Sequence, residues 1–464
     1  MYTLSSKLKL VSIIFMVVGL IGLAYGFIAA PSSIEEVKEM VASHDDGHGG
    51  PVSEAHTPEM GDGEDADGLE VVPSEHQAET ERTDGSEHVT AEGAHDDEHY
   101  EHLLHQLQNK PWAALYVAAF FFFMIALGTM AFYAVQYAAQ AGWSPVLFRV
   151  MEAISYYLIP GGIIMFLLLL LSGFHVNHLF IWMDPEVVAH DEIIQGKTAY
   201  LNVPFFLLRA AIYIGGWCFF MFMMRRNSWR QDEATDNLWF KKNFKLAAGF
   251  LVFFIVTESM MSWDWIMSLD PHWFSTLFGW YVFASMFVSA ITMIALVTIY
   301  LKSRNYLPFV NDSHIHDLAK FMFGLSIFWS YLWFSQFMLI WYSNIPEEVV
   351  YFAARFDDYA LPFLGMVALN FLFPVLLLMN SDFKRVNWFV VMTGIVILIG
   401  HYLDIYVMVM PATVGESWFI GVPEISAMLF FSGLFIFVVF SALTKAPLLA
   451  KRNPFIKESE HYHY

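Results

Sequence analysis

The sequence predicts an all-α polytopic membrane protein with about ten transmembrane helices. Of its 464 residues, 57% are hydrophobic and only 15% are charged, and the mean hydropathy is +0.49. Apolar runs of about 20 residues, the length that crosses the hydrocarbon core of a bilayer, recur along the chain. Lipid offers the backbone no hydrogen bonds, so each run is expected to be a helix. We therefore expect lipid as a neighbour and no nucleic acid as a partner.

The predicted spans follow the apolar runs in order. Their limits are 8–30, 112–138, 148–172, 203–224, 243–265, 274–301, 317–342, 361–379, 386–409 and 422–446. The first run has a basic start and a small-residue end, as a signal peptide does, but its apolar part is long for one, and we predict a retained helix. The chain then divides into a first helix (1–30), an extramembrane loop (31–111), a four-helix bundle (112–265), a second four-helix bundle (266–409) and a last helix with its tail (410–464).

Lysine and arginine predict the orientation. If the N-terminus is cytoplasmic, 18 of the 24 basic residues lie on the cytoplasmic side and five on the outside, with Arg209 inside a helix. Cytoplasmic loops of membrane proteins are enriched in basic residues. We expect both termini in the cytoplasm and the loop after the first span outside.

That loop carries most of the negative charge. Residues 42–105 hold 19 acidic residues and one basic residue, so they account for 18 of the 21 net negative charges. They also hold nine histidines, among them His95, His99, His102 and His105. A solvated acidic loop is the interpretation we prefer, and metal binding is the alternative.

Three pairs of short segments suggest an internal repeat with a spacing of about 160 residues. "WMDPEVV" after the third span matches "WYSNIPEEVV" after the seventh, and "LNVPFFLL" matches "YALPFLGM" at the starts of the fourth and eighth. "NKPWAAL" matches "DPHWFST" at the starts of the second and sixth, and the fifth and ninth spans place Asp264 on Asp404. The common order predicts two parallel four-helix bundles, spans 2–5 and 6–9, with spans 1 and 10 added.

Ionisable residues within the spans gather in the predicted outer half. Such residues are costly in lipid, so they usually face the bundle interior and have a partner. We predict one proton-handling network there; its members are Arg209, Glu258, Asp264, His401, Asp404 and Glu424. The alternative for each is a buried ion pair that only joins helices.

The inner half holds fewer polar groups. Glu152 shares a helix face with Tyr156, and a hydroxyl stripe on the sixth span comprises Ser285, Ser289 and Thr292. The stripe is a candidate continuation of the proton network, although such hydroxyls more often bond a neighbouring helix or their own backbone.

Redox centres are not expected on this chain. Its single cysteine, Cys218, cannot form a disulfide, a haem attachment site or an iron–sulfur cluster. No two histidines face each other within spans as a haem b requires, since only His401 lies securely in one. We predict no metal site and no catalytic residue.

Several segments resemble the F subunit of bacterial alternative complex III. They are "HQLQNKPWAALYVAAFFFFMIALG", "HLFIWMDPEVVAHDEIIQGK", "SWDWIMSLDPHWFSTLFGWY", "FWSYLWFSQFMLIWYSNIPEE" and "TKAPLLAKRNPF". The third is the most specific, and the resemblance covers nearly the whole chain outside residues 42–105. Members of this family are often described as the second quinone-binding subunit of a quinol:cytochrome c oxidoreductase.

The resemblance implies a membrane subunit of the polysulfide-reductase type in the bacterial inner membrane, with the acidic loop in the periplasm. It implies partners that carry the redox centres, namely a multihaem cytochrome c, an iron–sulfur subunit and a paralogous C subunit, and a terminal oxidase as a further candidate. Quinol is the substrate of that complex, and the C subunit is expected to oxidise it. For a quinone site on this chain the only candidates are His175 and His178, just outside the third span.

Two other functions stay open. A stand-alone secondary transporter of protons or metal ions would also have repeats and buried acids, but it should have mid-membrane breaks at matching repeat positions. Pro160, Gly161 and Gly162 interrupt the third span, and the seventh span has no such interruption. A purely structural subunit has the same sequence features as one that conducts protons.

Overall fold

The computed structural model describes residues 2–38, 87–416 and 419–463, without the side chains of 87–99 and 102. Most of the acidic loop, including His95, His99 and His102 as side chains, therefore lies outside the described residues. The described part is helical with no strands, and ten of its helices are long and apolar enough to cross a membrane. The chain is thus an all-α polytopic membrane protein, as predicted.

The membrane-length helices follow the predicted spans closely. They are α1 (Ser6–Ile28), α3 (Glu87–Ala138), α4 (Phe148–Ser155) with α5 (Leu158–Gly173), α8 (Val203–Glu233), α9 (Leu238–Trp265), α10 (Phe278–Ser303), α11 (Asp312–Ser343), α13 (Ala360–Val367) with the π-helical η4 (Ala368–Leu372) and α14 (Phe373–Leu378), α15 (Asn387–Val414) and α16 (Val422–Leu443). The short helices are η1 (Pro145–Leu147), η2 (Ile181–Met183), α6 (Pro185–His190), α7 (Glu192–Lys197), η3 (Met267–Leu269), α12 (Pro346–Asp357), η5 (Phe383–Arg385) and α17 (Ile456–Glu460).

Residues divide into two compact units. One comprises residues 1–30 and 108–464 and holds the transmembrane core, and the other comprises residues 31–107. Within the second unit, residues 34–38 are helical and the Lys38 ammonium lies 5.0 Å from the centre of the Tyr100 ring.

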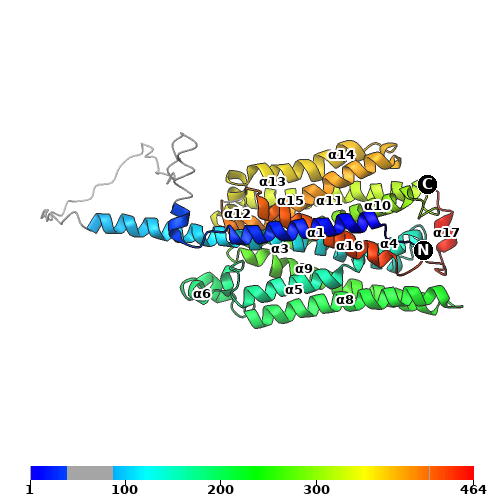
Figure 1. The fold of residues 1–464 in the computed structure, drawn as a ribbon, viewed down its shortest axis with the longest axis horizontal. Helices are drawn as coiled ribbons and strands as arrows, with labels where there is room; N and C mark the ends of the chain where they lie inside the picture. Colours follow the sequence, from blue (N-terminus) through cyan, green and yellow to red (C-terminus); the bar gives the residue numbers. More distant parts are fainter. Residues whose placement is uncertain (1, 39–86, 417–418, 464) are drawn as a thin grey trace, which may run out of the picture. The chain divides into compact units, whose positions relative to one another are not determined.

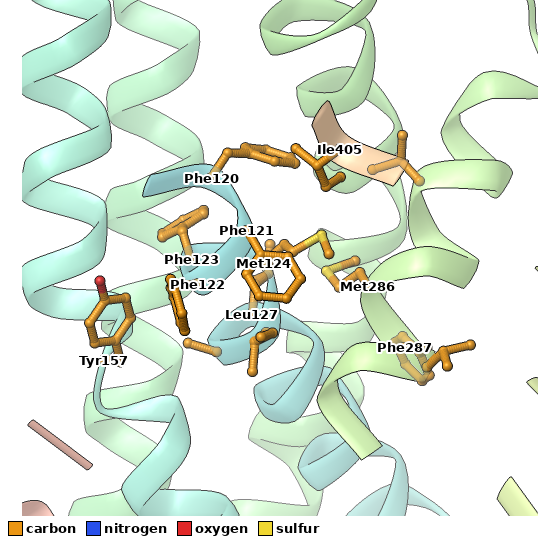
Figure 2. Close-up of a cluster of buried hydrophobic side chains, with 14 of the residues drawn as sticks. Phe120, Phe121, Phe122, Phe123, Met124, Leu127, Tyr157, Met286, Phe287 and Ile405 are labelled. Carbon is orange, nitrogen blue, oxygen red and sulfur yellow. The ribbon is translucent and has the colours of Figure 1, made fainter. Parts of the chain in front are cut away.

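Helices α3 and α10 form the centre of the core. In the most apolar stretch of each helix, 94% of the residues of α3 and 83% of those of α10 are buried, against 22% for α1. Figure 2 shows the phenylalanines of α3 (Phe120–Phe123) between Tyr157 on one side and Met286 and Phe287 of α10 on the other. A Cβ on Gly128 would lie 2.8 Å from the backbone oxygen of Met286, so glycine lets these two helices touch. Each is the first helix of its predicted repeat.

The remaining helices pack around this centre, and most of them contact the helix that precedes or follows them in the sequence. α8 contacts α5 and α9 on the side of the first bundle, while α10 contacts α11 and α15, and α15 contacts α13, on the side of the second. The two groups meet where α9 packs on α10.

The first and last membrane helices pack on each other along their length, side by side in Figure 1. Glycines on both helices make this possible: a Cβ on Gly19 would lie 2.5 Å from the backbone of Phe430, and one on Gly433 would lie 2.6 Å from that of Ser12. Small residues at such contacts let helices approach closely where lipid gives no hydrophobic drive for association. Residues 1–30 thus have a packing role in the folded chain.

Polar side chains fix where several helices begin. The Asn202 side chain accepts a hydrogen bond from the Phe205 amide at 3.1 Å, and Pro204 occupies the first turn of α8, where a missing N–H costs nothing. Asn311 caps α11 in the same way.

Both termini lie on one face of the core, which we call the terminal face (residues 2–5, 139–147, 304–311 and 444–463; Figure 1). Tyr2 packs on Tyr306 with ring centres 4.9 Å apart, and burial raises the pKa of Tyr2 to about 12. The C-terminal tail (residues 444–463) crosses this face, where the Ser459 hydroxyl donates to the Trp143 carbonyl at 2.6 Å.

The tail also joins the two bundles. The Tyr462 hydroxyl donates to Asp317 of α11 at 2.6 Å, and the Tyr462 carbonyl accepts from Asn311 at 2.6 Å. Arg452 donates to the Ala234 carbonyl, which follows α8. The tail therefore contacts the first bundle at two loops and the second bundle at α11.

The other end of the core is the opposite face (residues 174–202, 266–277 and 344–359). Lys197 donates to the Pro271 carbonyl, and His272 lies 2.5 Å from the Asp191 carboxylate. The amide of Ile194 and the His272 ring hold the pKa of Asp191 below its usual range. Loops from different helix pairs are thus connected at this face as well.

The orientation can be tested by cysteine labelling. We expect a cysteine at Gly196, on the opposite face, to react with a membrane-impermeant maleimide in intact cells, and one at Lys241, at the start of α9, to react only after permeabilisation. Gly196 is exposed with nothing within 4 Å of a Cβ built there, and Lys241 is exposed. The unaltered chain is the background, since Cys218 is partly buried within α8. The reverse labelling pattern would overturn the predicted orientation.

Candidate functional site

The ionisable residues of the spans form separate clusters in the structure. We name three of them: the Arg209 pair (Arg209, Asp264, Tyr213), the Asp404 cluster (Asp404, His401, Tyr281, Ser285, Trp329, Asn370) and the Glu152 cluster (Glu152, Arg149, Tyr133, Asp232, Ser228). Glu258 and Glu424 belong to none of the three. The single outer network expected from the sequence is therefore divided between the bundles.

The Arg209 pair joins α8 to α9 in the first bundle. Arg209 binds Asp264 through two bonds, Nε to Oδ2 at 2.8 Å and Nη2 to Oδ1 at 2.9 Å. The Tyr213 hydroxyl adds a bond to Oδ2 at 3.2 Å. A two-bond arginine–carboxylate contact is the strongest form of this interaction.

Aromatic side chains complete the surroundings of Arg209. Its guanidinium lies 3.9 Å from the centre of the Tyr200 ring and 4.3 Å from that of Phe205, and its Nη1 donates to the Tyr200 carbonyl at 3.0 Å. Arginine stays protonated in proteins, so its positive charge faces the Asp264 carboxylate. The pair is suited to holding two helices together.

The Asp404 cluster is built differently. Tyr281 and Ser285 of α10 donate to the Asp404 carboxylate, Ser285 at 2.8 Å, and the Trp329 indole of α11 donates at 2.9 Å. His401, one turn before Asp404 on α15, places Nδ1 3.3 Å from Oδ2. All of these are neutral or titratable groups, and within the described residues no lysine or arginine pairs with Asp404.

The π-helical segment is the fourth helical segment to reach this cluster, and it adds a sixth side chain. Asn370 lies in η4, and its amide nitrogen is 3.4 Å from His401 Nδ1. A Cβ on Gly400 would lie 2.1 Å from the Asn370 side-chain oxygen, so glycine leaves room for that amide. Single π turns in membrane helices often mark functional sites.

Asp264 and Asp404 occupy matching repeat positions but have unlike partners. One is held by an arginine and the other by tyrosine, serine, tryptophan and histidine. With the spacing of 158 that aligns Pro204 with Pro362, the residue matching Arg209 is Val367. The position that matches Arg209 thus holds no cation, and the buried arginine of the second bundle, Arg355 of α12, lies against the Tyr351 ring at 3.3 Å.

Buried hydroxyl groups extend from the Asp404 cluster toward the terminal face. Ser289 donates to the Ser285 carbonyl at 2.8 Å, and the hydroxyls of Thr292, Thr298 and Thr393 are buried with no hydrogen-bond partner in the protein. From Ser285 to Thr292, which share a face of α10, the distance along the helix is about 10 Å, and Thr298 lies on another face, about 220° around the axis from Ser285. A buried polar atom without a partner costs about 1–3 kcal/mol, which water molecules would offset.

The Glu152 cluster lies in the half of the first bundle nearer the terminal face. Arg149 donates to Glu152 at 2.6 Å and also binds Asp232, and the Tyr133 hydroxyl donates to Glu152 at 2.8 Å. Tyr156, which the sequence places on the same helix face as Glu152, is not among its bonding partners in the described contacts.

Glu258 and Glu424 stand apart. Glu258 is 2% exposed, its Oε1 has no partner and its Oε2 is 3.4 Å from the hydroxyl of the adjacent Ser259. Glu424 accepts from the Gly421 amide at 2.8 Å and so caps its own helix, while its Oε1 has no partner. Neither carboxyl group contacts a cation in the described part of the chain, and an unpaired buried carboxylate is costly.

The quinone candidates lie in the loop after α5 on the opposite face. The backbone of His178 is bonded to the Asn109 side chain through both its amide and its carbonyl, each at 3.1 Å. His175 has a positive φ of 58°. The prediction of a quinone site there is untested by these contacts.

The sequence analysis missed several partners. Tyr281, Trp329 and Asn370 complete the Asp404 cluster, and Arg149 and Asp232 complete the Glu152 cluster. Asn370 and Arg149 had a signal, since they lie in the predicted spans 361–379 and 148–172, where an amide or a charged group needs a partner.

Within the described residues, no group of three or more histidine, cysteine, aspartate or glutamate side chains is placed to hold a metal ion. The sequence matches no protein-family model and no curated protein. Function must therefore be argued from the residues and their geometry.

The structural role of the Arg209 pair can be tested by a double-mutant cycle. Arg209→Leu should lower stability by about 3–5 kcal/mol because it leaves Asp264 buried and unpaired. Arg209→Leu with Asp264→Leu should recover part of the loss, because no charge is then stranded. Thermal unfolding in mild detergent measures both, and Arg304→Leu, at an exposed arginine, is the control. A double variant as unstable as the single one would show that the ion pair is not the cause.

Proposed function

We propose that this chain is an integral membrane subunit of a respiratory quinol:electron carrier oxidoreductase of the alternative complex III type. In this proposal it carries no redox centre. Haem c and iron–sulfur clusters belong to partner subunits, and quinol is oxidised by the complex. The proposed setting is a bacterial inner membrane, with the terminal face in the cytoplasm. The segments that resemble the F subunit, and the ten-helix fold, support this assignment.

We further propose that the second bundle handles protons and the first bundle holds the subunit together. The observation that carries this is the Asp404 carboxylate, fully buried and bonded only by neutral or titratable groups. Proton exchange requires a carboxyl group that is stable in both its charged and its neutral form, and an adjacent arginine would stabilise only the charged form. Asp264 is bonded to such an arginine, Arg209.

The proposed path for protons through the second bundle connects the terminal face with Asp404. The hydroxyls on α10 and α15 lead from the terminal face to Ser285, and Ser285 donates to Asp404. Tyr281, one turn nearer the opposite face, also donates to Asp404. Water between these hydroxyls would complete a chain of hydrogen bonds along which protons move without a metal or cofactor in the path.

The transporter alternative has less support. The third span is interrupted where α4 meets α5, but α11, at the matching repeat position, runs unbroken from Asp312 to Ser343. The π-helical interruption lies in the eighth span instead. Paired breaks at matching positions, which alternating-access transporters use, are not seen in these helices.

Co-purification tests the assignment to a complex. From native membranes solubilised in mild detergent, an affinity-tagged chain should bring down subunits with haem c absorption bands and iron–sulfur signals. A colourless chain that purifies alone, and that transports an ion when reconstituted, would instead support the transporter.

Proton release per electron tests the role of Asp404. In vesicles that hold the whole complex, Asp404→Asn should reduce proton release while quinol oxidation continues, because asparagine keeps the shape and cannot exchange the proton. Glu258→Gln is the matched comparison: it removes an equally buried carboxyl group that does not contact the Asp404 cluster. Unchanged stoichiometry at normal turnover in Asp404→Asn would mean that the cluster only joins helices.

A further inference from the structure

A pocket of about 370 Å³ opens beside the terminal half of the first bundle, and no carboxylate lines it. It lies between the α4–α5 junction, the last turns of α8 and the segment after α16. Its lining consists of Tyr156, Met221, Phe222, Arg225, Arg226, Trp229 and Lys445.

The pocket has three cations and no counter-ion. Among the described residues, none of Arg225, Arg226 and Lys445 forms an ion pair with a carboxylate. The other two buried arginines of the first bundle, Arg149 and Arg209, both do. The positive charge of the pocket is therefore left for a ligand to neutralise.

The nearest carboxylate is already occupied. Glu152 lines a space of only about 10 Å³ behind Arg225 and Trp229. It is bonded to Arg149 and Tyr133. A gap of that size holds about one water molecule, so an anion larger than water must bind on the outer side of Arg225.

Aromatic rings hold the cations in place without neutralising them. The Arg225 guanidinium lies 4.3 Å from the centre of the Tyr156 ring and 4.7 Å from that of Trp229. The Lys445 ammonium lies 4.8 Å from the Tyr156 ring and 3.5 Å from its hydroxyl. Such contacts position a cation while leaving its charge available.

The lining also has unused hydrogen-bond donors. Arg225 donates one bond, to the Ala442 carbonyl at 3.2 Å, but its buried Nε has no partner. The buried Trp229 Nε1 has no partner either. Unpaired donors beside unpaired cations indicate a ligand that is both anionic and rich in acceptor oxygens, as a phosphate group is.

Its position places the pocket at the edge of the membrane. α8 has 31 residues, about 46 Å, which exceeds the roughly 30 Å of the hydrocarbon core. The basic turns of α8 from Arg225 onward are at the terminal-face end of that length. Just before them, Phe219 and Phe222 are 55% and 54% exposed and face outward, where lipid is expected.

We propose that this pocket binds the headgroup of an anionic phospholipid, of the phosphatidylglycerol class, in the leaflet on the side of the terminal face. Arg226 and Lys445, which are exposed, contact the phosphate, and Arg225 supplies the positive charge behind it. Met221 and Phe222 line the path of an acyl chain. A free phosphate would gain the charged contacts but not the apolar ones, so lipid is the favoured ligand. This site does not depend on the function proposed above.

Lipid binding to the purified full-length chain tests the proposal. Native mass spectrometry in mild detergent, with added phosphatidylglycerol, should show that Arg226→Gln with Lys445→Gln weakens binding about 30-fold, since each basic group near a lipid surface contributes about fivefold. Lys241→Gln with Lys245→Gln is the matched control. It removes two exposed charges at the start of α9, close in sequence to the end of α8, that do not line the pocket. This control should bind as the wild type does.

Three results would overturn the proposal. They are equal loss of phosphatidylglycerol in the control variant, equal binding of uncharged phosphatidylcholine to the wild type, and displacement of the lipid by millimolar inorganic phosphate. Thermal unfolding without added lipid shows that both double variants are folded, since all four changed residues are exposed. Arg225→Gln then tests the contribution of the buried charge by itself. It should weaken lipid binding although Arg226 and Lys445 are intact.

Discussion

A polar group inside a bilayer has no water to bind, and this constraint organises the whole core. Each charged or hydroxyl-bearing side chain in a span must find its partner on another helix or on its own backbone. Arg209, Arg149 and Asp404 do so across helices, and in doing so they set which helices are neighbours. Where no partner is available, as at Glu258, the cost has to be offset by the rest of the fold. Helix packing and polar chemistry therefore cannot be separated in this protein.

The two bundles meet that constraint in opposite ways. In the first, an arginine bound through two bonds fixes the charge of Asp264. In the second, the aspartate at the matching position is surrounded by hydroxyl, indole and imidazole groups. The two aspartates that the predicted repeat aligns are therefore held by different kinds of partner, one by a cation and the other by groups without a fixed charge.

The sequence was sufficient for the fold and insufficient for the contacts within it. Span length and hydropathy depend on local composition, so the ten helices followed from the runs of apolar residues. Which way a side chain points around its helix depends on the neighbours of that helix. Glu258 and Asp264 are therefore close in sequence, yet only Asp264 reaches Arg209. The π turn that carries Asn370 has no signature in an apolar run, so its approach to His401 could not be predicted.

The C-terminal tail has a consequence for how the protein is made. Its bonds are to loops that follow the second and fourth spans and to the start of the seventh, all of which leave the ribosome long before Tyr462 does. Those loops are closed on the terminal face only once residues 444–463 have been synthesised. A polypeptide cut short by proteolysis or premature termination would insert most of its helices and still lack this closure.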